Sequence, residues 1–140
     1  DLIDMRSMRD EQYQWILHTK DHFSKFSWSY PLCTKEAEAV AEKLLQQFYL
    51  FGVPRILQSD NGKEFVAKVI KVVVFLMHHL VALSSYYIGL KNVWPELVII
   101  NGRPRHPQTQ GLVERGNQTL ELALGKWMEG NNRKDWSNGK

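Results

Sequence analysis

Cysteine is nearly absent from this sequence, because Cys33 is the only one among 140 residues. A single thiol excludes an internal disulfide framework, and it excludes any zinc site built from cysteines within these residues. This scarcity fits a reducing compartment, so we expect the chain to work inside the cell.

Long apolar runs are also missing. The longest, Val72–Leu83, is interrupted by His78 and His79 and is too short to span a bilayer. The chain opens Asp-Leu-Ile-Asp, which predicts no signal peptide. There is no internal repeat, low-complexity tract or flexible linker. The sequence therefore predicts one domain, residues 1–140, with a core of its own and no membrane contact.

The net charge is small as well. Eighteen basic and 15 acidic residues give a formal net charge of +3, and the hydrophobic content of 44% is ordinary for a soluble globular protein. A weak basic bias permits a phosphate-bearing partner without requiring one.

The first third of the chain predicts strands. Asp1–Met5 alternates weakly, Tyr13–His18 is rich in β-formers, and Phe23–Tyr30 includes aromatic side chains that alternate with polar ones. Period two is typical of a half-buried strand. A turn at Asp21-His22 or at Ser24-Lys25 would join the last two, so we predict an antiparallel hairpin with Asp1–Met5 as a third strand.

The next segment predicts a helix with one apolar face. We expect Thr34 to be its N-cap and Gly52 to end it, with Pro54 following. The apolar residues at helical spacing are Ala37, Val40, Ala41, Leu44, Leu45 and Phe48.

Two short elements follow. Arg55–Ser59 predicts a buried strand, and Lys63–Lys71 starts a helix. Residues 72–93 are apolar without clean periodicity, so no element is predicted there.

The last third predicts a strand, a loop and a long helix. Leu97–Ile100 is rich in β-formers, and Asn101–Gln108 contains a glycine and two prolines that forbid regular structure. The final helix is predicted from about Gln108 to Met128. Its apolar face comprises Leu112, Gly116, Leu120, Ala123, Leu124 and Trp127. The whole pattern is a mixed α/β arrangement.

Two carboxylates occupy the ends of predicted elements. Asp60 follows the strand Arg55–Ser59, where open α/β sheets place ligand groups, and Asn61-Gly62 makes the turn after it. Glu114 lies in the first turns of the last helix, where an acid is held rigidly near the positive end of the helix dipole. Alone, Asp60 reads as a plain turn residue and Glu114 as a solvated helix acid. Together, at matched element ends, they favour a shared site.

Three motifs in order carry a resemblance. They are Asp-Leu-Ile at the start, Ser59-Asp60-Asn61-Gly62-Lys63-Glu64-Phe65, and His106-Pro107-Gln108-Thr109-Gln110-Gly111-Leu112-Val113-Glu114. This set resembles the catalytic core of retroviral and Ty3/gypsy-type retrotransposon integrases, and it looks similar to the domesticated copies in vertebrate host genes.

The resemblance implies a ribonuclease H-like α/β fold with a mixed five-stranded sheet flanked by helices. It also implies a triad of two aspartates and a glutamate, which at the matching positions are Asp1, Asp60 and Glu114. These acids would hold two Mg²⁺ or Mn²⁺ ions. Asp4 competes with Asp1 for the first place. The motif favours Asp1, and the alternation of a strand means that the two cannot both point inward.

The resemblance further implies contacts with DNA. Asn61 follows the second acid, Gln108 and Gln110 match a flexible loop near the cut, and Asn117 lies one turn after Glu114 on nearly the same helix face. In retroviral cores basic residues follow the glutamate, and the comparable residues here are Gln118 and Glu121. We therefore expect phosphate contacts from Arg103, Arg105 and Arg115.

The sequence departs from the family between the second and third acids, where the spacing is longer than usual. The surplus falls in residues 72–93, which we interpret as an apolar insert. We also expect the core to be incomplete at both ends.

Two functions from different classes remain open. One is DNA processing and strand transfer by phosphoryl transfer, performed by a nuclear homodimer. The other is a catalytically silent domesticated domain that binds nucleic acid or protein inside a larger host protein. A ribonuclease H-like nuclease of another family fits less well, because of the His-Pro-Gln-Thr-Gln-Gly motif.

Overall fold

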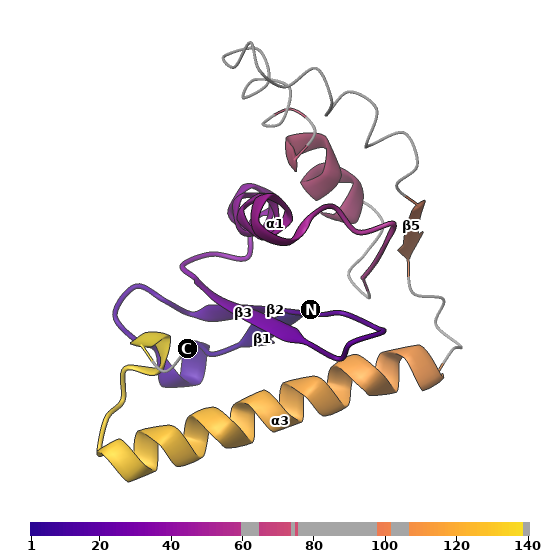
Figure 1. Ribbon diagram of the computed structural model, residues 1–140. Helices are drawn as coiled ribbons and strands as arrows, with labels where there is room; N and C mark the ends of the chain where they lie inside the picture. The colour runs from indigo at the N-terminus through magenta and orange to yellow at the C-terminus, as the bar shows by residue number, and fades with distance from the viewer. Residues whose placement is uncertain (60–64, 74, 76–97, 102–106, 139–140) are drawn as a thin grey trace. The chain divides into compact units, whose positions relative to one another are not determined.

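A computed structural model describes residues 1–59, 65–73, 75, 98–101 and 107–138 (Figure 1). The chain forms two compact units. The first unit comprises Asp1–Lys35 and Pro104–Lys140, and the second comprises Glu36–Arg103. The assignment of residues 1–140 to one domain stays a prediction.

The first unit contains an antiparallel sheet. Its strands are β1 (Leu2–Asp4), β2 (Trp15–Lys20) and β3 (Ser27–Leu32), in the order β1-β2-β3. A short 3-10 helix, η1 (Arg6–Met8), follows β1. The predicted hairpin with a third strand is confirmed.

The position of β3 differs from the prediction, because β3 begins at Ser27 and not at Phe23. The Asp21 carboxylate accepts hydrogen bonds from the backbone N–H and the hydroxyl of Ser24, both at 2.6 Å. Lys25 adopts a positive φ of 64°. The turn therefore uses both predicted dipeptides, and it leaves Phe23 95% exposed instead of within a half-buried strand.

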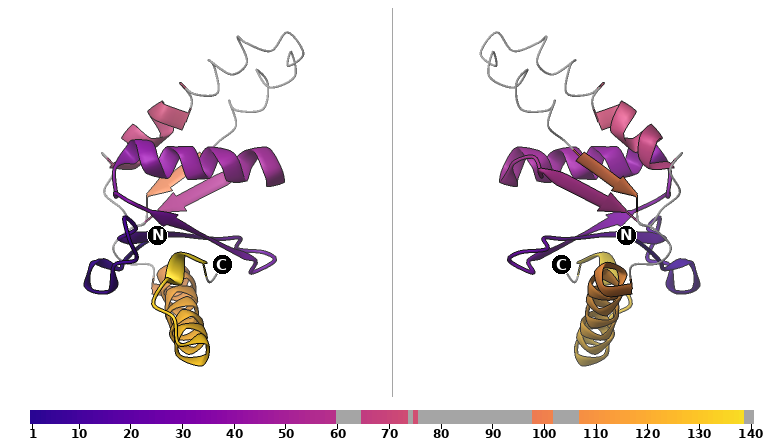
Figure 2. Two further views of the ribbon diagram at one scale, coloured as in Figure 1. Left: turned by 90° about the vertical axis from the view of Figure 1, so that its left-hand side faces the viewer. Right: turned by 90° about the vertical axis from the view of Figure 1, so that its right-hand side faces the viewer.

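One face of this sheet packs against the long helix α3 (Pro107–Asn131), as Figures 1 and 2 show. Ile3 and Ile16 are direct partners across β1 and β2, so their side chains share a face. Leu124 and Trp136 close the cluster from the C-terminal segment, where Trp136 belongs to the 3-10 helix η3 (Trp136–Asn138). The buried cluster comprises Ile3, Met5, Ile16, Leu124 and Trp136, with Tyr13, Leu120 and Met128 packed around it.

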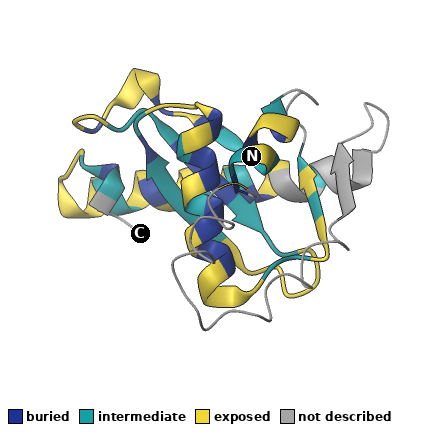
Figure 3. Ribbon diagram, turned by 90° about the horizontal axis from the view of Figure 1, so that it is seen from above, coloured by how far each residue is buried: buried dark blue, intermediate teal, exposed yellow. Residues whose placement is uncertain are grey.

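The contacts of α3 confirm part of its predicted face. Gly116 and Leu124 are buried, and Leu120 is half-buried. Ala123 is exposed, which contradicts its assignment to the apolar face. Figure 3 colours the ribbon by burial and shows buried and exposed residues along the helices. The loop predicted over Asn101–Gln108 is wrong at its end, since α3 starts at Pro107, where the missing N–H of proline costs no helical hydrogen bond.

The second unit contains the helix α1 (Ala37–Phe51). Its N-cap is Glu36 and not Thr34, and no side chain caps this end, so the packing of the apolar face and not a cap decides where the helix begins. Gly52 ends it as predicted, with φ of 88° and its N–H donating to Phe48 O at 2.9 Å. Every predicted apolar position is buried.

Residues 65–73 of the second unit are helical, with Val66, Val69 and Val73 buried along one side. Lys68 forms an ion pair of 3.6 Å with Glu38 of α1. This helix continues past the predicted end at Lys71.

The strands β4 (Ile56–Ser59) and β5 (Val98–Asn101) pair in parallel as a two-stranded sheet. Ile56 is 53% exposed, so β4 is not the buried strand that its composition predicts. Among the described residues β5 is the strand that pairs with β4. The described strands thus form sheets of three and two strands. The predicted insert at 72–93 lies outside the described residues, apart from 72, 73 and 75.

Candidate active site

Asp1 and His18 are opposite each other at the end of the β1–β2 ladder. The backbone nitrogen of Asp1 donates to His18 O at 2.7 Å, and the N–H of His18 donates to Asp1 O at 2.9 Å. Residues that exchange both bonds in an antiparallel pair direct their side chains to the same face. Since Ile3 and Ile16 lie two residues further along, Asp1 and His18 share the face that α3 covers.

Asn117 of α3 joins these two side chains. Its Nδ2 donates to Oδ2 of Asp1, and its Oδ1 lies 2.6 Å from Nδ1 of His18. The other carboxylate oxygen of Asp1 accepts the N–H of Leu2 at 2.8 Å. The result is a continuous polar chain from β2 through α3 to the residue that precedes β1.

The direction of every hydrogen bond in this chain follows from the carboxylate. An ionised carboxylate only accepts, so the amide nitrogen of Asn117 faces Asp1 and the amide oxygen faces His18. An oxygen can meet only a protonated ring nitrogen. His18 therefore carries its proton on Nδ1.

His18 is 2% exposed. Burial lowers the pKa of this imidazole from its ordinary value, the hydrogen bond with Asn117 offsets part of that shift, and the charge of Lys20 lowers it further. A pKa below the ordinary value keeps the ring neutral near pH 7.

Sequence patterns did not single out His18. It lies inside a predicted strand, but its partner across the strand depends on register, which composition leaves open. Alternation from Ile16 would have placed it on the buried face. A histidine on an apolar face opposite an acid is the signal that could have found it.

Asp4 lies away from this chain. Its carboxylate makes a bidentate contact with Arg6, with Arg6 Nε at 2.9 and 3.0 Å and Arg6 Nη2 at 2.6 Å. This hydrogen bonding lowers the pKa of Asp4. Asp4 sits three residues after Asp1, so a strand turns it to the opposite face. Of the two competing acids, Asp1 is the one beside α3.

Glu114 and Arg115 lie in the third turn of α3, and both are exposed. Glu114 precedes Asn117 by three residues, a spacing that places two side chains on the same side of a helix. Because Asn117 reaches Asp1, Glu114 lies one turn away along that side. Arg115 turns back to its own helix, since its Nε donates to Gly111 O at 3.1 Å.

The remaining predicted site residues are only partly covered by the structure. Asp60, Asn61, Arg103 and Arg105 lie outside the described residues. Gln108 and Gln110 belong to the first turns of α3, as the helix predicted from about Gln108 requires, and not to the flexible loop that the resemblance implies.

The chemistry of the donor set suits a hard divalent ion. Carboxylate oxygens are the ligands that Mg²⁺ and Mn²⁺ prefer. Both carboxylate oxygens of Asp1 accept hydrogen bonds, one from Leu2 and one from Asn117. Within the described residues there is no cluster of three His, Cys, Asp or Glu side chains that could hold a metal, and Asp60 is not among these residues.

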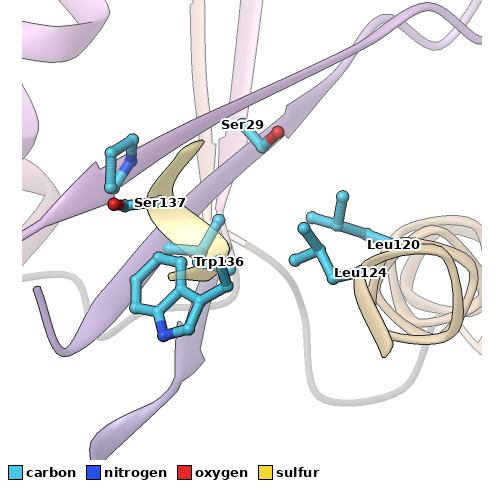
Figure 4. Close-up of a pocket in the computed structure, with 7 residues that line it drawn as sticks. Ser29, Leu120, Leu124, Trp136 and Ser137 are labelled. Atoms are coloured by element: carbon cyan, nitrogen blue, oxygen red, sulfur yellow. The ribbon is translucent and has the colours of Figure 1, made fainter. Parts of the chain in front are cut away.

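A small cavity lies between α3, the sheet and η3 (Figure 4). Its volume is about 30 Å³, room for a water molecule or two and far too little for a nucleotide. Its lining residues are Ile16, Ser29, Pro31, Leu120, Leu124, Trp136 and Ser137. The polar chain at Asp1 is therefore the better candidate site in the first unit.

Comparisons with known proteins identify the class. The family model described as the integrase core domain matches residues 1–85. The chain belongs to the integrase core domain family. It is similar to the human KRAB-A domain-containing protein 2, with 32% identity over 139 residues, 99% of this chain and 25% of that protein. It is also similar to the Gag-Pol polyprotein of feline leukemia virus, with 30% identity over 125 residues, 89% of this chain and 6% of the polyprotein.

A solved structure has the same fold. The catalytic core domain of BIV integrase superposes with a TM-score of 0.62 at 22% identity, covering 94% of this chain and 69% of that one. The chain thus has the mixed α/β integrase core fold. It spans a quarter or less of the length of the two relatives above. In the described part of the chain, no helix combines the length and the apolarity that crossing a membrane would need.

Proposed function

We propose that this chain is an integrase-type core that processes DNA ends and transfers strands by phosphoryl transfer. The observation that carries the proposal is the contact between Asn117 and Asp1, in a member of the integrase core family. It ties the helix that carries Glu114 to the strand that follows Asp1. In the complete fold we expect both sheets to join in one five-stranded, ribonuclease H-like sheet, with Asp60 as the third acid.

The acids Asp1, Asp60 and Glu114 would hold the metal ions. Two Mg²⁺ or Mn²⁺ ions would activate a water or a 3′-hydroxyl at one side of a phosphodiester and stabilise the departing oxygen at the other. Asn117 holds the Asp1 carboxylate in one orientation through the hydrogen bond from its Nδ2. Asn61, Gln108, Gln110, Arg103, Arg105 and Arg115 would contact DNA, mostly at phosphates and without reading sequence.

The proposed function also implies a cellular compartment and an oligomeric state. A DNA-processing core with a single cysteine suits the reducing interior of the cell, and we propose a nuclear homodimer that acts on DNA.

A silent, domesticated domain is the second candidate. The similarity over 99% of the chain to a human protein named for a KRAB-A domain favours it. The surface of α3 also favours the silent domain. Gln118 and Glu121 are exposed at positions where a DNA-binding helix would carry basic residues. Such a domain would bind DNA or protein without cutting.

A disintegration and strand-transfer assay with Mg²⁺ or Mn²⁺ separates the two candidates. We expect product from the wild-type chain and none above background from Asp60→Asn or Glu114→Gln. Equal activity in these variants would contradict the triad. No product from the wild-type chain, with DNA still bound, would favour the silent domain.

A further inference from the structure

His18 is the one buried histidine of the described residues, and family resemblance assigns it no role. It lies in β2, on the same face as Asp1, and its ring meets the amide of Asn117 at 2.6 Å. We propose that His18 is a positioning residue that fixes the orientation of the Asp1 carboxylate through Asn117. This inference rests on the proposed metal site for its functional consequence.

The geometry favours a donor at position 18. The side-chain amide of asparagine can rotate by half a turn, which exchanges its oxygen and nitrogen. If the amide turned over, its oxygen would face the Asp1 carboxylate, and its nitrogen would face Nδ1 of His18, which could accept only after its proton had moved to Nε2. The reversed amide thus loses the hydrogen bond to Asp1 and needs a change of tautomer, so the Nδ1–H of His18 stabilises the orientation that keeps a donor on the Asp1 carboxylate.

Burial makes this donor rigid. His18 is 2% exposed, and both the N–H and the C=O of its backbone form hydrogen bonds with the backbone of Asp1. On the helix side, a Cβ at Gly116 would lie only 2.8 Å from Cε1 of His18. The ring thus lies directly against the backbone of α3, one residue before Asn117. A side chain confined in this way presents Nδ1 in one direction.

Outer hydrogen-bond partners of this kind set the orientation of metal-binding carboxylates. Their loss typically lowers metal affinity about 10- to 100-fold. Asn117 alone could swing away from Asp1, because its side chain is only half-buried. With His18 present, the oxygen and the nitrogen of the Asn117 amide both form hydrogen bonds.

The test compares His18→Leu, which removes the donor, with His18→Gln, whose amide can still donate to Asn117. Mn²⁺ binding to the full chain is followed by the electron paramagnetic resonance signal of the free ion. We expect His18→Leu to bind Mn²⁺ about 10-fold more weakly than wild type, and His18→Gln to recover most of that loss. Wild-type affinity in His18→Leu, or an equal loss in both variants, would overturn the proposal.

Nuclear magnetic resonance supplies a readout that needs no metal. In the wild-type chain the ¹⁵N shifts of His18 should show the proton on Nδ1, and the Asp1 carboxyl ¹³C shift should move in His18→Leu and return in His18→Gln. If His18→Leu does not fold, Asn117→Ala replaces it, because the Nδ1–H tautomer should then lose its preference. An unchanged tautomer in Asn117→Ala, or an unmoved Asp1 shift in a folded His18→Leu, would overturn the proposal.

These measurements separate two kinds of failure. If Asp60→Asn and Glu114→Gln leave Mn²⁺ affinity unchanged, the metal site of the proposed function is wrong, and the resonance data alone then decide whether His18 positions Asp1.

Discussion

Gly116 of α3 lies so close to His18 of β2 that a Cβ added at the glycine would come within 2.8 Å of Cε1 of the ring. Real side chains do not approach this closely. The glycine is therefore needed for the helix to reach the sheet where Asn117 meets Asp1. Helix propensity alone would favour alanine at this position by about 1 kcal/mol.

Gly116→Ala should destabilise the chain, because its added methyl group has to displace a buried ring. We expect a loss of about 1–3 kcal/mol in the free energy of unfolding, as in other overpacked cores. Gly125→Ala is the matched control in the same helix, since a Cβ there would have nothing within 4 Å. It should gain about 0.5–1 kcal/mol from helix propensity. Urea unfolding measures both, and a stabilised Gly116→Ala would contradict the close contact.

Trp136→Ala should cost about 3–5 kcal/mol, the usual range for a buried tryptophan. Trp136 is 3% exposed, packs with Ile3 and Leu124, and donates its ring N–H to Met8 O at 2.6 Å. Trp127→Ala is the control, because Trp127 is only half-buried on α3. If the two variants unfold at the same urea concentration, the C-terminal segment does not close the core as described.

Stability should fall as the pH is lowered through the titration of His18. Its pKa is lowered in the folded chain by burial, so below the unfolded value near 6.5 the unfolded chain binds more protons. The stabilisation from the neutral ring is complete above that pH and decreases as the pH falls toward the lower, folded pKa. Unfolding curves between pH 8 and pH 5 measure the effect. His18→Gln should lose this part of the pH dependence, and an unchanged dependence would contradict the assignment.

Asp1→Asn and Asp4→Asn should differ in activity although the residues are three apart. Asp1 contacts Asn117, whereas Asp4 pairs with Arg6 at an exposed position. In the strand-transfer assay we expect Asp1→Asn to be inactive and Asp4→Asn to keep wild-type activity. The opposite pattern would show that the first acid of the triad is Asp4.

Local patterns were sufficient to predict the elements. The spacing of Val40, Leu44 and Phe48 predicted α1, and Gly52 marked its end, because helix periodicity and a positive φ are properties of a few neighbouring residues. The N-cap at Thr34 was wrong, since the helix begins with the packing of Ala37 and needs no side-chain cap. The start of β3 lies later than predicted, because the carboxylate of Asp21 accepts a hydrogen bond from the backbone N–H of Ser24 and extends the turn.

The site could be predicted only as residue types. Asp1, Glu114 and Asn117 were named from motifs, but the helper role expected for Asn117 was contact with DNA, and in the structure its amide faces Asp1 and His18. That connection spans 116 residues of sequence and depends on strand register and on the approach of α3 at Gly116. Neither is a local property, so the sequence alone does not predict the role of His18.

The most direct test of the central claim is anomalous diffraction from crystals of the chain soaked with Mn²⁺. The account predicts two manganese peaks about 3.5–4 Å apart, in contact with the carboxylates of Asp1, Asp60 and Glu114. It would be contradicted by the absence of peaks at these acids, or by Asp60 and Glu114 carboxylates more than about 8 Å apart, too far to share two ions at that spacing.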